Sequence, residues 1–346
     1  MKKYFLLFAI TCGVYAANAQ LNDNETPYST RLLSADNIQS VEVRTSGGSI
    51  SVKGNSGSDA RIEMYVHSSN GNNTLTKEEI KQRLDEYYNV DISVSNHKVT
   101  AIVKEKRNNI DWRRGVSISF RVYVPQNVST DLETSGGSIS LADLNGNQKF
   151  ETSGGSLHVD DLAGHTVGST SGGSIHVSNS HDYIDLETSG GSIEASNCSG
   201  TIKLETSGGS LHLDNLKGTI RAGTSGGSAE GSDISGELAI ETSGSGIRLR
   251  NLSCSLEAST SGSSIDVEMT TLGKYVKIDN SGGNINLTIP KGKGVDLTLD
   301  GDRIKTNELD NFRGSQEEGH MKGTLNGGGI PITLDAGGGR VNLTIR

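Results

Sequence analysis

Two histidines and a carboxylate stand at related positions in this chain and could do chemistry together. His158 and His176 are separated by one 18-residue interval, and Asp160 follows His158 by two. Two imidazoles and a carboxylate on one face are a ligand set for Zn²⁺ or Cu²⁺. We favour a solvated polar face instead and predict no metal site, because the same position reads Glu194, Glu230 and Arg248 farther along.

Other catalytic and binding motifs give weaker signals. Asp300, Asp302 and Asp310 are loop acids that could bind Ca²⁺, but such acids are common. The sequence contains no His-Glu-x-x-His, Cys-x-x-Cys or phosphate-binding loop, and the segment 226–231 only approaches Gly-x-Ser-x-Gly. We therefore predict no catalytic residues and no cofactor.

An internal repeat dominates the sequence and must position these side chains. Thr-Ser-Gly recurs with an 18-residue period, at Thr134, Thr152, Thr170, Thr188, Thr206, Thr224, Thr242 and Thr260. A looser copy begins at Asn280 after a two-residue insertion, and an isolated copy begins at Thr45. Within each unit, apolar and polar residues alternate, which predicts short strands with one buried face, separated by Gly-rich turns.

Stacked copies of such a unit bury a continuous core. We predict an all-β, single-chain parallel β-solenoid with one 18-residue repeat per coil, and we expect right-handed winding from the general preference for right-handed crossovers. A meander of hairpins is the rival, but it would not repeat identical apolar columns with a constant 18-residue period.

The repeat also predicts where three other side-chain types lie. The threonine of each Thr-Ser-Gly should face inward, with its hydroxyl bonded to a neighbouring coil. Cys198 and Cys254 lie three coils apart, roughly 14 Å, which exceeds the reach of a disulfide. We expect two small buried residues and no bridge.

The N-terminal part of the chain differs from the repeat. Lys2 and Lys3 precede an apolar run and a small-residue cleavage site, so residues 1–19 are predicted to be a signal peptide rather than a membrane anchor or a lipidation signal. A leader segment (20–34) and N-terminal strands with a capping helix (35–130) precede the solenoid repeats (131–346). The helix, about 76–88, begins with Thr76 and Glu79 as a capping box. Trp112 belongs to this cap rather than to a ligand platform.

Composition and charge limit the partners. Losing Lys2 and Lys3 with the signal peptide changes the net charge from −9 to −11. An acidic chain argues against a nucleic-acid partner, which needs a basic patch. We expect an exported protein, periplasmic or at the cell surface, without a transmembrane anchor.

Three features of the sequence resemble a known protein family. They are Thr134-Ser135-Gly136-Gly137-Ser138-Ile139 with its copies, the strand ending at Pro125, and the closing segment from Asn326 to Ile330. Over about residues 38–346 the chain resembles the putative-adhesin family of bacterial β-strand repeat proteins, and more distantly the bactofilin-like polymerising solenoids. The resemblance concerns the architecture, and our leading hypothesis for the function is a non-enzymatic, exported structural or interaction surface of the envelope, with an unknown envelope protein or glycan as partner. A carbohydrate-active β-helix enzyme and a self-assembling filament are the alternatives. The tight turns through 134–278 argue against the enzyme, and the oligomeric state is open.

Overall fold

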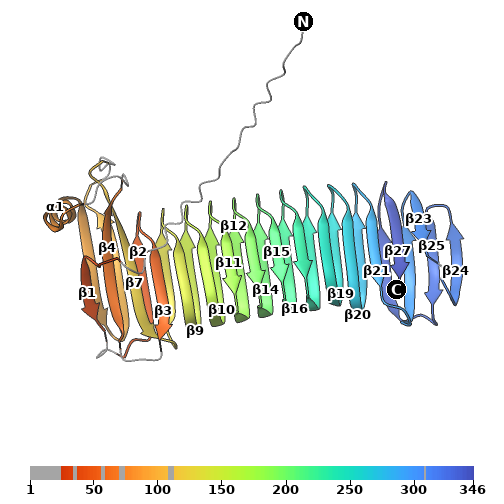
Figure 1. Ribbon diagram of the computed structural model, residues 1–346, viewed down its shortest axis with the longest axis horizontal. Helices are drawn as coiled ribbons and strands as arrows, with labels where there is room; N and C mark the ends of the chain where they lie inside the picture. The colour runs from red at the N-terminus through yellow and green to blue at the C-terminus, as the bar shows by residue number, and fades with distance from the viewer. Residues whose placement is uncertain (1–24, 34–36, 56–58, 70–74, 108–112, 308) are drawn as a thin grey trace, which may run out of the picture.

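The computed structural model is an elongated stack of β-coils (Figure 1). It describes residues 25–33, 37–55, 59–69, 75–107, 113–307 and 309–346. The predicted signal peptide, residues 20–24 and 34 of the leader segment, and Trp112 lie outside these residues. The described part contains 27 strands and one helix. The prediction of an all-β chain with a single helix is confirmed.

The central coils each contribute to two faces of the stack. The central strands are β8 (Ser129–Thr134), β9 (Ile139–Thr152), β10 (Leu157–Thr170), β11 (Ile175–Ser178), β12 (His181–Thr188), β13 (Ile193–Ser196), β14 (Ser199–Thr206), β15 (Leu211–Asp214), β16 (Lys217–Thr224), β17 (Ala229–Ser232), β18 (Ser235–Thr242), β19 (Ile247–Thr260) and β20 (Ile265–Asn280). We call the face of β11, β13, β15 and β17 the short face, and the face of β12, β14, β16 and β18 the long face. Strands β9, β10, β19 and β20 run through both.

Strand pairing between coils is parallel and in register with the repeat. Leu157 pairs with Ile139 on one side and with Ile175 on the other, each exactly one repeat away in sequence. The same interval separates partners on the long face, as for Ile184 and Ile202. The two-residue insertion before Asn280 is absorbed by register shifts between β19 and β20. Parallel stacking is thereby confirmed, and the hairpin meander is wrong for these coils.

Two turns shape each coil. One places Asn or Asp in the left-handed region, for example Asn197 with φ 54° and Asn215 with φ 50°, which short polar side chains tolerate. The other is Ser-Gly-Gly, where successive coils touch backbone to backbone. A Cβ added to Gly191 would lie 2.2 Å from the carbonyl oxygen of Gly173. In this coil the second glycine of the turn is therefore required by close approach.

The isolated repeat copy near the N-terminus is a full member of the stack. It forms β2 (Ser40–Thr45) and β3 (Ile50–Asn55). Thr45 pairs with Thr134, and Ile50 pairs with Ile139, both in parallel. The long separation in sequence, which broke the 18-residue period, is therefore spanned by an excursion that returns to the neighbouring coil.

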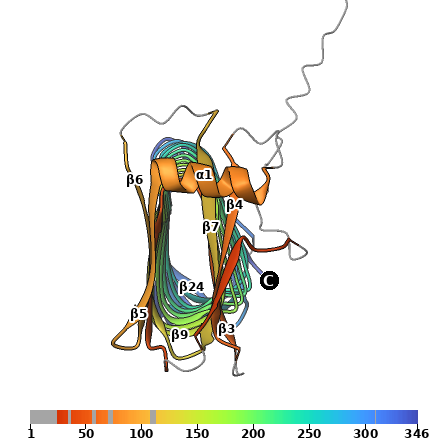
Figure 2. The ribbon, with the colours of Figure 1, turned by 90° about the vertical axis from the view of Figure 1, so that its left-hand side faces the viewer.

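The excursion builds the N-terminal end. Its strands are β4 (Arg61–Ser68), β5 (Tyr88–Ser95), β6 (Lys98–Glu105) and β7 (Val116–Pro125), with β1 (Ser29–Leu32) beside β4. Strands β6 and β7 add in parallel to β2 and β3, whereas β5 and β4 close the two faces in antiparallel fashion. Helix α1 (Lys77–Tyr87) crosses this end (Figure 2) and begins with the predicted Thr76–Glu79 capping box.

At the C-terminal end, too, the order of the strands in space differs from their order in the sequence. Its strands are β21 (Ile285–Ile289), β22 (Val295–Asp300), β23 (Arg303–Thr306), β24 (Phe312–Glu317), β25 (His320–Leu325), β26 (Ile330–Asp335) and β27 (Arg340–Ile345). The last strands of the chain, β26 and β27, insert between β20–β21 and β22–β23. The antiparallel β25 and β24 lie outermost on the long face.

Candidate functional site

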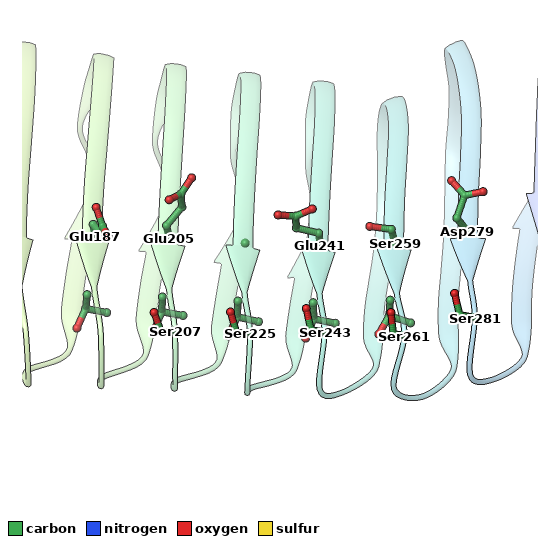
Figure 3. A pocket seen from close by; sticks show the side chains of 16 residues that line it. Glu187, Glu205, Ser207, Ser225, Glu241, Ser243, Ser259, Ser261, Asp279 and Ser281 are labelled. Atoms are coloured by element: carbon green, nitrogen blue, oxygen red, sulfur yellow. The ribbon is translucent and has the colours of Figure 1, made fainter.

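A hollow in the surface forms a groove that runs along the stack axis, with a volume of about 450 Å³. Its serines and acidic side chains lie in two parallel rows (Figure 3). We call it the serine groove. The serine row is Ser207, Ser225, Ser243, Ser261 and Ser281, and the acidic side chains are Glu187, Glu205, Glu241 and Asp279.

The repeat itself creates the two rows. Thr206 is buried, and its neighbours Glu205 and Ser207 are exposed. Because successive side chains in a strand point to opposite faces, both neighbours of an inward threonine must point outward. Every coil along the groove except that of Gly223 therefore adds one polar group to either side of its buried threonine or, at position 280, asparagine. The groove is a direct product of the inward threonine column.

Buried threonines form the floor beneath these rows. Thr206 and its equivalents are each at most 5% exposed from Thr134 to Thr260. Thr188 Oγ1 donates to the carbonyl oxygen of Gly173 at 2.7 Å and accepts from the N–H of Gly191 at 3.3 Å. The predicted inward threonine ladder with bonds between coils is confirmed.

A missing side chain deepens the groove on the long face. Gly223 stands where neighbouring coils carry Glu205 and Glu241, and Ala239 lies on the next coil. An adjoining hollow of about 310 Å³ forms here, and Arg221 and Glu257 also line it. The sequence contains a signal of this hollow, because Gly223 interrupts a column of outward-facing glutamates. The prediction of polar faces considered only the outward column that contains His158 and His176, on the short face.

The groove carries negative charge. Its lining contains four carboxylates and no lysine, arginine or histidine. Lys203 lies beside it and bridges Glu205 at 3.3 Å and Asp185 at 3.6 Å. Glu187 and Glu241 form no ion pair with any described residue. Hydroxyls can donate and accept hydrogen bonds, and free carboxylates can accept them, from a polar or cationic chain lying along the axis.

A second hollow lies on the short face and has mixed charge. It measures about 400 Å³ and is lined by Glu194, His212, Asp214, Glu230, Arg248 and Arg250, among others. Its charges largely pair with one another: Arg248 lies 3.2 Å from Glu230, and His212 lies 3.9 Å from the same carboxylate. This internal pairing leaves less free charge for a ligand than the serine groove offers.

The structure brings His158, His176 and Asp160 onto the short face without arranging them around a common point. The imidazoles stack with centroids 5.2 Å apart, and His176 lies 3.3 Å from Glu194. Asp160 instead accepts hydrogen bonds from Ser178 at 2.7 Å and from Asn179 at 2.8 Å. Burial, and then the charge of His176, lowers the pKa of His158.

No cluster of three or more His, Cys, Asp or Glu side chains suited to a metal ion is found in the described ranges. Of the three loop acids, Asp300 lies 2.5 Å from the Nδ1 atom of His320.

The two described cysteines are structural. Cys198 and Cys254 are both buried free thiols. Burial raises the pKa of Cys254 to about 12. A thiol with so high a pKa is a poor nucleophile.

Comparison with known proteins gives a family likeness for the C-terminal part. The family described as Toastrack DUF4097 matches residues 222–344, from the end of β16 to the end of β27. This segment lies within the residues that resemble the putative-adhesin family. No curated protein matches the chain.

A solved structure of a "putative cell adhesion protein" from Clostridium sporogenes ATCC 15579 is 12% identical, with 92% of this chain and 98% of that chain covered. Its TM-score of 0.20 is too low to carry an argument. Neither match is to a bactofilin. No helix among the described residues is both long and apolar enough to cross a bilayer.

Proposed function

We propose that the mature chain is a non-enzymatic, exported β-solenoid that serves as an adhesin-like interaction surface of the cell envelope, periplasmic or at the cell surface. The Toastrack likeness of residues 222–344 supports this proposal. The signal peptide proposed for residues 1–19 supplies the route of export. Right-handed winding and 18-residue coils belong to the same proposal.

The serine groove is the observation that carries the proposal. It follows the axis from Glu187 to Ser281 and is open and polar. An extended polymer can lie along such a groove and meet the same groups at each coil, about 4.8 Å apart. The partner is therefore an extended segment of an envelope protein or a glycan, bound through hydroxyls and carboxylates.

The shape of the coils supports a binding role over catalysis. Turns between the central strands are tight, so no long loops rise beside the groove to enclose a substrate. Enzymes generally exclude water from the reacting groups. A carbohydrate-active enzyme remains the alternative from another class, and turnover of a polysaccharide that Glu205→Gln abolishes would replace our proposal with it.

Capture of envelope components by the mature protein tests the groove directly. Glu241→Lys reverses charge inside the groove, and Glu151→Lys makes the same change in the same outward column but outside the groove. We expect Glu241→Lys to lose the captured component and Glu151→Lys to retain it. Equal capture by both variants would remove the groove as the binding site.

A further inference from the structure

The N-terminal end exposes an edge strand, and this feature is independent of the groove and of the proposed function. Strand β5 is eight residues long and pairs only with β6 among the described strands. It is the last strand of the long face at this end. An open edge presents a row of backbone groups that another strand can pair with.

The hairpin geometry decides which groups of β5 point outward. Asn96 and His97 form a two-residue turn with φ of 50° and 61°, so Ser95 and Lys98 close the hairpin. At the far end the N–H of Lys106 donates to the carbonyl of Tyr87. Hydrogen-bonded pairs alternate in antiparallel strands. The backbone N–H and C=O groups of the odd-numbered residues of β5 therefore bond to β6. Those of the even-numbered residues point to the open edge.

Contacts at the edge agree with this assignment. Arg31 of β1 reaches across the end and donates to the carbonyl of Ile92 at 2.7 Å. The N–H of Tyr88 donates to the carbonyl of Leu84 in α1. The described residues supply no partner to the edge-facing N–H and C=O groups of Val90 and Val94. With respect to the described residues, most of the edge therefore has no hydrogen-bond partner.

This edge also lacks the usual protection against pairing. Strand β5 carries one charged residue, Asp91, and no lysine, proline or glycine. Val90, Ile92 and Val94 are only half-buried. Leu32, 71% exposed on β1 beside β4 at the same end, is the one large apolar side chain that is exposed in the described part of the chain. Apolar surface thus accompanies the free backbone groups.

The opposite end is protected. Strand β24 is the outermost strand of the long face there, and it carries Arg313, Gly314 and Glu317. Five of its six residues are exposed, and Gly314 and Gln316 give it no apolar row beyond Phe312. The two ends therefore differ in their capacity to accept another strand.

We propose that two copies of the chain join head to head, by antiparallel pairing of β5 with β5 of a second copy around a two-fold axis at Ile92. This pairing sets Val90 opposite Val94 of the other copy and continues the apolar row. It also sets Asp91 opposite Ser93, so the two like charges do not face each other. The carbonyl of Ile92 keeps a second lone pair for the new bond. A two-fold interface closes on itself and gives a dimer rather than a filament.

Sedimentation of the full mature chain tests the proposal with two proline variants. Val94→Pro removes only an edge-facing N–H, so it blocks pairing and spares the β5–β6 ladder. Gln316→Pro makes the matched change at the edge of β24. We expect dimers for the wild type and Gln316→Pro, and monomers with unchanged circular dichroism for Val94→Pro. A monomeric wild type at the highest soluble concentration overturns the proposal, as does dissociation by Gln316→Pro alone.

A cysteine variant keeps the test decisive if Val94→Pro unfolds the cap. Ile92→Cys places two thiols across the axis with Cα atoms about 5.5 Å apart, within disulfide range. We expect oxidation to yield a covalent dimer, and Gln316→Cys to yield none. Failure of Ile92→Cys to cross-link in a folded protein contradicts the pairing. Binding at the serine groove would survive either result, so this failure is distinguishable from failure of the proposed function.

Discussion

The side-chain oxygen of Thr206 donates a hydrogen bond to the carbonyl oxygen of Gly191, in the preceding coil, at 2.7 Å. The same oxygen accepts the N–H of Gly209 at 3.2 Å. One hydroxyl thereby joins two Ser-Gly-Gly turns of adjacent coils. The arrangement recurs along the stack, so the threonine column connects the turns of successive coils by hydrogen bonds.

Replacing this hydroxyl tests the ladder. Thr206→Val keeps the shape of the side chain but leaves the half-buried N–H of Gly209 and carbonyl of Gly191 without their partner. We expect a loss of about 1–3 kcal/mol in the free energy of unfolding, measured by urea denaturation. Ser207→Ala, on the exposed side of the same turn, should change stability by less than about 0.5 kcal/mol. Equal losses for the two variants would contradict the inward ladder.

The two glycines of one turn should differ sharply in their tolerance of alanine. A Cβ at Gly191 would lie 2.2 Å from the carbonyl oxygen of Gly173, whereas one at Gly190 has no atom closer than 3.3 Å. Gly191→Ala must push two backbones apart and should cost more than about 3 kcal/mol. Gly190→Ala should lower the thermal midpoint only slightly. Similar midpoints for both variants would show that the coils are not in backbone contact here.

A neighbouring pair of residues tests the register of the strands. Ile193 is fully buried, and Glu194 beside it is exposed. Ile193→Asp places an unpaired charge in the core, which should unfold the adjacent coils or lower the unfolding free energy by at least about 4 kcal/mol. Glu194→Ala loses only a surface contact with His176 and should shift it by less than about 0.5 kcal/mol. Thermal shifts of equal size would refute the register.

The stacked histidines predict a dependence of stability on pH. Burial and the neighbouring His176 lower the pKa of His158 from its usual 6.5. The unfolded chain then binds a proton more readily than the folded chain, so stability is complete above pH 6.5 and falls as the pH drops below it.

The thermal midpoint of the wild type should therefore decrease between about pH 7.5 and about pH 5. His158→Gln should reduce that decrease. His181→Gln, at an exposed position, serves as the control and should leave the decrease unchanged. A pH dependence that His158→Gln does not alter would rule out this residue as its source.

The repeating coil could be predicted from the sequence because the residues that form it lie close together in the chain. Each unit carries its own turn residues, its inward threonine and its alternating strands, so parallel stacking and the burial of Ile193 follow from spacing alone. The capping box of Thr76 and Glu79 is equally local, and α1 begins where it predicts. Burial of Cys198 also follows, because the cysteine occupies an inward column.

Pairing between distant segments was decided only by the tertiary structure. Nothing in the spacing places Thr45 against Thr134 across an excursion, or β27 between β21 and β23, because a parallel strand can pair with any compatible edge. The groove around Gly223 likewise depends on which side chains of adjacent coils surround a missing one. Sequence determined the repeating coil, because the interactions that form it act within one unit and between that unit and the next, which is alike. The ends and the hollows depend on contacts between units that are not alike, and only the assembled chain sets these.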